Sequence, residues 1–178
     1  MSLSIQDLAR ELGEIAGGNA AALPPQSPPE VAATGEGLPA PAPTVPPPPV
    51  QVVEYAAKGY HLDATVPADR VVAAAVLLEK QGFAMDAITG VDWMAQNEME
   101  VVYDYFHPAV SMRVVVRCRV PRGAPEVPTI SHVFAGANWH ERETHEFFGI
   151  RFVGHPNLVP LLLPEDAEYH PLRKDFVA

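Results

Sequence analysis

The sequence predicts an α+β fold in which a small, mostly antiparallel sheet carries helices on one face. Between residues 52 and 150 the apolar pattern runs in the order strand, helix, three strands, helix. Two segments lie outside that pattern: a stretch with eleven prolines between Pro24 and Pro49, and a leucine- and proline-rich stretch after Gly149. We therefore divide the chain into a short amphipathic helix (1–18), a disordered proline-rich linker (19–51), an α+β domain (52–150) and an extended, partner-binding tail (151–178).

Residues 4–16 predict a short amphipathic helix. Ser4 at the start, with Asp7 three positions on, predicts an acidic variant of the capping box. Apolar residues recur at helical spacing along one face: Ile5, Leu8, Leu12 and Ile15. A helix of about three turns is marginal alone in water, so we expect it to dock on something.

The proline-rich segment 19–51 is expected to populate polyproline II without a packed core. Two interpretations stay open from the sequence. The segment is an inert linker, or it is a tether that carries the N-terminal helix to a partner. A ligand for a proline-recognition domain is a third option.

The first half of the domain alternates clear strand and helix signals. Residues 60–66 alternate like a strand, and Pro67 then opens a helix that Gly82 ends. Its predicted inward face is Val71, Ala74, Ala75 and Leu78. Three strands follow at 84–93, 98–106 and 110–120, and the short connection between the last two predicts an antiparallel hairpin.

The second half of the domain is less regular. Residues 121–129 hold three prolines and predict a loop. Residues 130–148 predict a helical segment that is broken around residues 136–138, with Gly149 at its C-cap. The four prolines that follow predict an extended and largely irregular tail.

Charge and cysteine content exclude several classes of function. With 12 basic and 22 acidic residues the net charge is −10, which argues against a nucleic-acid or anionic-membrane surface. The basic group Arg113, Arg117, Arg119 and Arg122 is expected to form a solvated strand face. The single cysteine, Cys118, cannot by itself support a disulfide, a four-thiolate iron–sulfur cluster or a multi-cysteine zinc site. We expect it to be a buried or half-buried strand residue.

No segment has the length to cross a bilayer, because the longest fully apolar run, residues 71–78, is far short of about 20 residues. The N-terminus carries charges where a signal peptide has its apolar region. We therefore expect a cytoplasmic chain that reaches a membrane only through partners.

The histidine-rich run near the C-terminus first suggests a zinc hydrolase. The working motif is H-E-x-x-H, in which two histidines four apart share one metal. Here His140 and His145 are five apart, so on a regular helix they diverge by about 140°. Arg142 and Glu146 are expected to form an ordinary ion pair. With no nucleophile or phosphate-loop motif either, we predict a non-catalytic subunit and hold a stand-alone zinc hydrolase as an unfavoured alternative.

The tail suggests a contact surface. Its leucine-rich part, Leu158 to Leu163, would be poorly soluble unless covered. Two interpretations apply to different parts of it. The leucine cluster could wrap back over its own domain, whereas residues 170–176, nearer the end of the chain, are expected to enter a partner groove.

Two motifs then identify a family. They are Glu141-Arg142-Glu143, continued by Glu146-Phe147-Phe148-Gly149-Ile150 and Gly154-His155-Pro156, and the later run His170-Pro171-Leu172-Arg173-Lys174-Asp175-Phe176. This block resembles the thirty-kilodalton, C-type subunit of complex I, the proton-pumping NADH:quinone oxidoreductase. Departures include Glu146 where the family usually has Asp, and Val159-Pro160 where it often has two arginines. The run 160–164 and the pair His145-Glu146 are also similar to the equivalent subunit of group 4 energy-converting nickel–iron hydrogenases and formate hydrogenlyase.

The resemblance implies a peripheral-arm subunit without a redox centre, on the cytoplasmic side of the cell membrane. Its implied partners are the forty-nine-kilodalton-type subunit (the D-type subunit of complex I, or the hydrogenase large subunit) and a neighbouring iron–sulfur subunit. Iron–sulfur clusters, flavin or a nickel–iron centre are expected in those partners, and no cofactor, metal or catalytic residue in this chain. The residues implied to hold a partner are Glu141, Arg142, Glu143, Glu146, His155, Pro156, His170, Arg173, Lys174 and Asp175.

Overall fold

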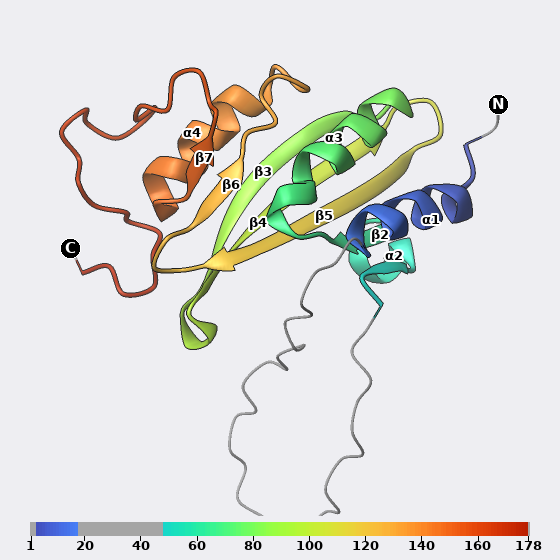
Figure 1. Ribbon diagram of the computed structural model, residues 1–178, viewed down its shortest axis with the longest axis horizontal. Helices are drawn as coiled ribbons and strands as arrows, with labels where there is room; N and C mark the ends of the chain where they lie inside the picture. Colours follow the sequence, from blue (N-terminus) through green and yellow to red (C-terminus); the bar gives the residue numbers. More distant parts are fainter. Residues whose placement is uncertain (1–2, 18–47, 178) are drawn as a thin grey trace, which may run out of the picture.

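The centre of the molecule is a five-stranded sheet, seen in a computed structural model that describes residues 3–17 and 48–177 (Figure 1). Its strand order is β1-β2-β5-β4-β3. The strands are β1 (Val50–Val52), β2 (Leu62–Thr65), β3 (Ala84–Trp93), β4 (Glu98–His107) and β5 (Met112–Pro121). Only the β2–β5 pair is parallel, which confirms the mostly antiparallel sheet.

Three helices of ten or more residues cover one face of this sheet: α1 (Ile5–Ala16), α3 (Val71–Lys80) and α4 (Ala137–Phe148). Gly90, Val101 and Cys118 are neighbours across β3, β4 and β5, so they share that face. The Phe148 ring of α4 lies against Gly90, and the buried side chains of α1 and α3 join the same core. The predicted one-sided arrangement is confirmed.

The other elements of the described residues are short. They are α2 (Tyr55–Lys58), the one-turn 3-10 helices η1 (Ala68–Arg70) and η2 (Met94–Gln96), and a separate parallel pair of strands, β6 (Glu126–Pro128) with β7 (Arg151–Val153). In Figure 1 this pair lies beside α4, at the opposite end of the molecule from α1. The tail after β7 loops out around α4.

Local sequence signals explain the regular elements. The inward face of α3 is the predicted one, with Val71, Ala74, Ala75 and Leu78 all buried. Gly149 ends α4 with φ +74°, a left-handed conformation that glycine adopts without a Cβ penalty. The β4–β5 hairpin forms as predicted, and Cys118 is fully buried in β5, where burial raises its thiol pKa to about 12.

Three strands were not predicted. β1 begins at Val50, inside the segment assigned to the linker, whose residues 19–47 lie outside the described part of the chain. β6 lies in the expected loop 121–129, and β7 in the expected irregular tail. The two strands pair residues far apart in the sequence, such as Glu126 with Arg151, and no local pattern reveals that contact. Residues 130–136 form turns, and α4 begins only at Ala137.

The N-terminal helix docks on its own domain. Leu8, Leu12 and Ala16 are buried in the common core, and Ile5 and Ile15 pack at its edge. Its apolar face is therefore covered within the chain, which argues against the tether interpretation of the linker. The predicted capping box is wrong, because the Ser4 side chain bonds Gln6 and caps no backbone N–H.

The face opposite the helices carries ion pairs. Arg113, Arg117 and Arg119 pair there with acidic residues of β2, β3 and β4, as a strand face reached by solvent requires. Arg122 does not belong to this group. Its side chain is only 15% exposed and bonds Asp92 and Asp175, so the prediction of a solvated arginine is wrong at this position.

Candidate functional site

The residues singled out in the sequence meet where the tail crosses α4. Residues 154–177 follow no regular secondary structure, yet they are attached to the domain at three places. Two of these attachments end on a buried carboxylate, and one ends on the last carbonyls of α4. Together they hold an extended segment in one conformation.

The first attachment is the carboxylate of Glu146, which is buried in the middle of the tail's leucine cluster. It accepts hydrogen bonds from the backbone N–H groups of Leu161, Leu162 and Leu163 at 2.8, 3.0 and 3.0 Å. Three successive N–H groups aimed at one anion form a concave binding site, and bonds to a charged acceptor are stronger than neutral ones. Glu146 therefore fixes the backbone of the leucine cluster.

Arg142, one turn earlier on α4, holds the adjoining residues. It donates to the carbonyl oxygens of Val159 and Pro160 at 2.9 and 2.8 Å, and its guanidinium lies over the Trp139 ring. The prediction of an ion pair between Arg142 and Glu146 is wrong. Both side chains bind the backbone of the tail instead, at adjoining positions of one short segment.

The second attachment caps the C-terminus of α4. His170 Nδ1 lies 2.8 Å from the Glu146 carbonyl, and Arg173 donates to the Phe148 carbonyl at 2.7 Å. The N–H of Leu172 donates to the Phe147 carbonyl. The last carbonyls of a helix lack partners within it and carry partial negative charge, so a cation suits them. A Cβ at Gly149 would collide with both Arg173 and His170.

The third attachment is the carboxylate of Asp92 at the end of β3. Arg122 binds it with two bonds of 2.8 and 3.0 Å, and the backbone N–H of Lys174 donates to it at 2.9 Å. Asp175 pairs with the same Arg122 at 2.6 Å. The Arg122 bonds hold the pKa of Asp92 below its ordinary value.

Glu141 occupies a different environment, under the start of the tail. Its side chain is fully buried and accepts hydrogen bonds from the Thr129 hydroxyl and from the Ile130 N–H, the latter at 2.7 Å. The imidazole of His155 is also buried, 3.9 Å away. Burial raises the pKa of Glu141 to about 7 and lowers that of His155.

Of the ten residues implied to hold a partner, eight make hydrogen bonds or ion pairs inside the chain. His155 is bonded to the Asn138 carbonyl, and Lys174 contributes its backbone N–H. Glu143 and Pro156 are exposed, with no side-chain hydrogen bond among the described residues. The tail thus wraps its own domain at the leucine cluster, as expected, and also at residues 170–176, contrary to expectation. A role in holding a partner stays a prediction for all ten.

Sequence reasoning missed Asp92 and Arg122. A signal was present, because residues 88, 90 and 92 alternate onto the covered face of β3 and a carboxylate there needs a partner. The partner could not be read from sequence. Arg122 is 30 residues away, and Lys174 lies 82 residues away.

The attached tail leaves large apolar side chains uncovered. We call these the exposed apolar set: Trp139, Val159, Leu162, Tyr169, Leu172 and Phe176. Trp139 is 60% exposed, Leu162 66% and Leu172 54%. Apolar exposure concentrated on one segment marks a binding surface, whereas scattered single residues do not. The attached tail can therefore present a binding surface to another protein.

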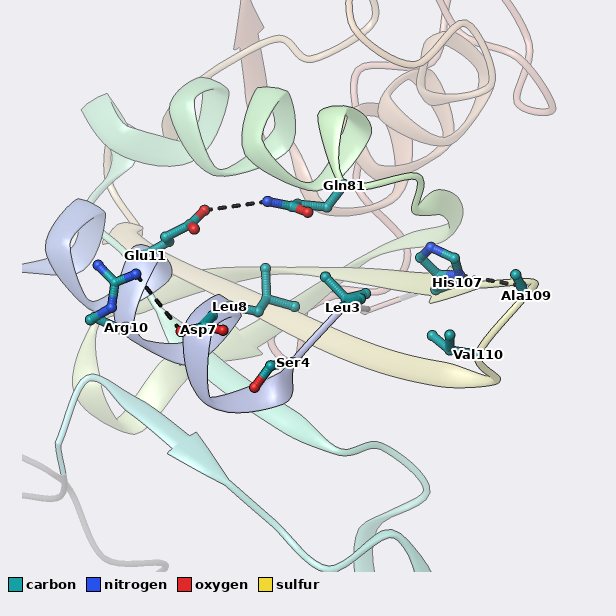
Figure 2. Close-up of a pocket in the computed structure, with 10 residues that line it drawn as sticks. All are labelled: Leu3, Ser4, Asp7, Leu8, Arg10, Glu11, Gln81, His107, Ala109 and Val110. Atoms are coloured by element: carbon teal, nitrogen blue, oxygen red, sulfur yellow. Dashed lines mark hydrogen bonds and ion pairs between the residues drawn. The ribbon is translucent and has the colours of Figure 1, made fainter. Parts of the chain in front are cut away.

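One pocket lies elsewhere, between the N-terminal half of α1 and the β4–β5 turn (Figure 2). It has a volume of about 430 Å³. Its polar residues bond to one another: Glu11 accepts from Gln81, and His107 Nδ1 accepts from the Ala109 N–H. These bonds assemble no pair of groups suited to acid–base or nucleophilic chemistry.

Three further observations bear on function. His145 Nδ1 lies 2.9 Å from the Ile150 carbonyl, and residues 3–17 and 48–177 contain no cluster of three side chains suited to hold a metal. Within the same residues, no helix combines the length and apolarity needed to cross a membrane.

Comparison with protein families identifies one match. The family described as respiratory-chain NADH dehydrogenase, 30 Kd subunit, matches residues 64–178. The matched part therefore begins within β2 and contains α4, the tail and all three attachments, whereas α1 and β1 lie before it.

Individual relatives agree. The chain is 45% identical over 95 residues to the C-type subunit of F(420)H(2) dehydrogenase from Methanosarcina mazei, covering 51% of this chain and 58% of that protein. It is 44% identical over 92 residues to the C-type subunit of NADH-quinone oxidoreductase from Roseiflexus castenholzii, covering 51% and 53%. The chain thus spans little more than half the length of these curated relatives.

A solved structure shares the fold. A chain of the membrane-bound sulfane sulfur reductase, an archaeal respiratory membrane complex, superposes with a TM-score of 0.60 at 30% identity. The match covers 65% of this chain and 71% of that one.

Proposed function

Because the chain belongs to the thirty-kilodalton subunit family of the respiratory-chain NADH dehydrogenase, we propose that it is a non-catalytic peripheral subunit of a membrane-associated electron-transfer complex of complex I type. It docks onto the forty-nine-kilodalton-type subunit, beside an iron–sulfur subunit, on the cytoplasmic side of the membrane. The whole complex carries out NADH:quinone oxidoreduction and proton translocation, and this chain takes part by holding its neighbours.

One observation carries the docking proposal: an irregular tail is fixed by three attachments while it presents the exposed apolar set. A segment that is already ordered before association loses less conformational entropy when it binds. The family motifs supply the side chains of the first two attachments, since Glu146, Arg142, His170 and Arg173 all bind tail or helix backbone.

The chain's own chemistry supports a role without a redox centre. Its one cysteine, Cys118, is buried in β5, and a cluster normally takes four thiolates, so this chain cannot by itself ligate an iron–sulfur cluster. In this proposal the iron–sulfur clusters, and the flavin or nickel–iron centre, belong to partner subunits.

The parent complex has an alternative. Subunits similar to this one are named for an F(420)H(2) dehydrogenase and for a sulfane sulfur reductase, so related chains occur in complexes with different names and reactions. The run 160–164 and the pair His145-Glu146 favour the equivalent subunit of an energy-converting hydrogenase or formate hydrogenlyase as this alternative. A co-purified large subunit with two C-x-x-C nickel motifs would decide for it.

The test is affinity capture of the tagged full chain from solubilised native membranes, with partners identified by mass spectrometry. The wild-type chain should retain a subunit of the forty-nine-kilodalton type. The double variant Leu162→Ser, Leu172→Ser should retain it at least about tenfold less, because two apolar anchors are lost.

Val52 and Val110 supply the matched control, since they are 54% and 48% exposed and lie in β1 and in the β4–β5 turn, outside the tail and its attachments. The variant Val52→Ser, Val110→Ser should capture the partner as the wild type does. Equal capture by both double variants, or a wild type that retains no respiratory-complex subunit, would contradict the proposal.

A further inference from the structure

Between the first two tail attachments runs a short loop, Pro164 to Glu168, which we call the acidic loop. Its only hydrogen bond among the described residues joins the Ala167 N–H to the Pro164 carbonyl. Glu165, Asp166 and Glu168 are all exposed, and none forms a salt bridge or a side-chain hydrogen bond within the described part of the chain. The loop is flanked by Leu162 and Tyr169 of the exposed apolar set.

The cations around this loop are already committed inside the chain. Arg142 and Arg173 donate to backbone carbonyls, and Arg122 is bound to Asp92 and Asp175. Lys174 is the exception, an exposed cation that lies beside Asp92. The arginines of this region therefore have their hydrogen-bond partners within the chain, whereas the three carboxylates of the acidic loop face solvent or a partner.

We infer that the partner surface which receives the tail is an apolar groove rimmed by lysine or arginine residues opposite the acidic loop. The inference rests on the proposed function, because it describes the chemistry of the subunit that docks there. The apolar side chains supply contact area, and the charges at the rim steer the encounter and fix the register. The acidic loop would therefore act chiefly on the rate of association and on its dependence on salt.

With a net charge of −10, the whole chain could attract a basic partner, whichever carboxylates are involved. The test therefore needs a control variant that removes the same number of charges elsewhere. The tail variant is Glu165→Gln, Asp166→Asn, Glu168→Gln. The control is Glu54→Gln, Asp69→Asn, Glu79→Gln, three exposed carboxylates outside the tail. Both variants raise the net charge by the same amount, and circular dichroism and thermal melting check that both remain folded.

The experiment captures partners with each full-length chain from native membranes at low and at high salt. Wild type and control should lose partner subunit as salt rises. The tail variant should capture about tenfold less at low salt and show little further dependence on salt.

The outcomes separate the two claims. If the wild type captures no respiratory-complex subunit, the proposed function fails. If it captures the subunit and the tail variant captures as much with the same salt dependence, the docking stands and the basic rim is wrong. In that case the acidic loop serves only the solubility of the chain.

Discussion

At the scale of single residues, carboxylates decide how this tail is held. Glu146 and Asp92 lie on different elements, yet each accepts backbone N–H groups from the tail. Glu146 carries its carboxylate to the tail from α4. Glu141 lies on the same helix, but it accepts its hydrogen bonds from the segment before the helix, at Thr129 and Ile130.

Glu141 predicts an unusual dependence of stability on pH. Its pKa is raised by burial from 4.5 to about 7, so between those values the folded chain binds a proton that the unfolded chain has lost. The free energy of unfolding should therefore fall as pH rises through this window, by an amount on the order of 3 kcal/mol at most, and stay level above it. Glu141→Gln should remove this slope.

Urea unfolding at several pH values checks the slope, with each variant compared with the wild type so that the other titrating groups cancel. His155, the nearest titratable neighbour, has its pKa lowered by burial and contributes in the opposite sense in both proteins. Glu143→Gln is the control, because Glu143 is exposed on the same helix and should leave the slope intact. An identical slope in Glu141→Gln would show that the carboxylate stays charged when buried.

At the scale of elements, α4 contacts both the sheet and the tail. Its Thr144 hydroxyl donates to the Ile88 carbonyl of β3, and its Phe148 ring lies where a side chain at Gly90 would stand. The close approach of helix and strand therefore depends on the missing Cβ. The position of α4 in turn sets where Arg142 and Glu146 meet the tail.

Gly90→Ala should displace α4. The new Cβ would lie 2.5 Å from the Phe148 ring, so the ring or the helix must move. We expect a loss of about 1–3 kcal/mol in the free energy of unfolding, as is typical of overpacked cores. Faster hydrogen exchange at residues 161–163 should accompany it, because their bonds end on α4.

Gly123→Ala is the matched control, since a Cβ at Gly123 meets nothing within 4 Å. Denaturant unfolding and hydrogen exchange with mass spectrometry measure both effects. Unchanged exchange at residues 161–163 in a destabilised Gly90→Ala would show that the tail is fixed independently of the helix position.

Local sequence signals predict the elements that make their own contacts, and fail where a contact spans the chain. α3, the β4–β5 hairpin and the Gly149 cap follow from apolar periodicity and turn chemistry within a few residues. β6 needs β7 to exist, and the Asp92 attachment needs Arg122 and Lys174. The same limit holds for the candidate site, because motifs identify its residues but do not reveal the bonds among them.

At the scale of the whole molecule, one core joins segments that the sequence separates widely. Leu8 and Leu12 of α1 pack in the same cluster as Leu62, Leu78 and Val116, although the first two precede the proline-rich segment. The family match begins at residue 64, so α1 adds to the matched domain from outside it. A core shared in this way should melt as a unit, because the buried side chains of the helix and of the sheet belong to one apolar cluster.

Leu12→Ala tests that unity. Leu12 is fully buried, and truncating a buried leucine to alanine typically costs about 2–5 kcal/mol through lost transfer energy and the cavity left behind. If α1 belongs to the core, thermal melting followed by circular dichroism should show one transition at lower temperature for the whole domain. Glu14→Ala, on the exposed face of the same helix, should melt close to the wild type. A helix held for a partner would behave differently: Leu12→Ala would leave the main transition in place and weaken capture of that partner.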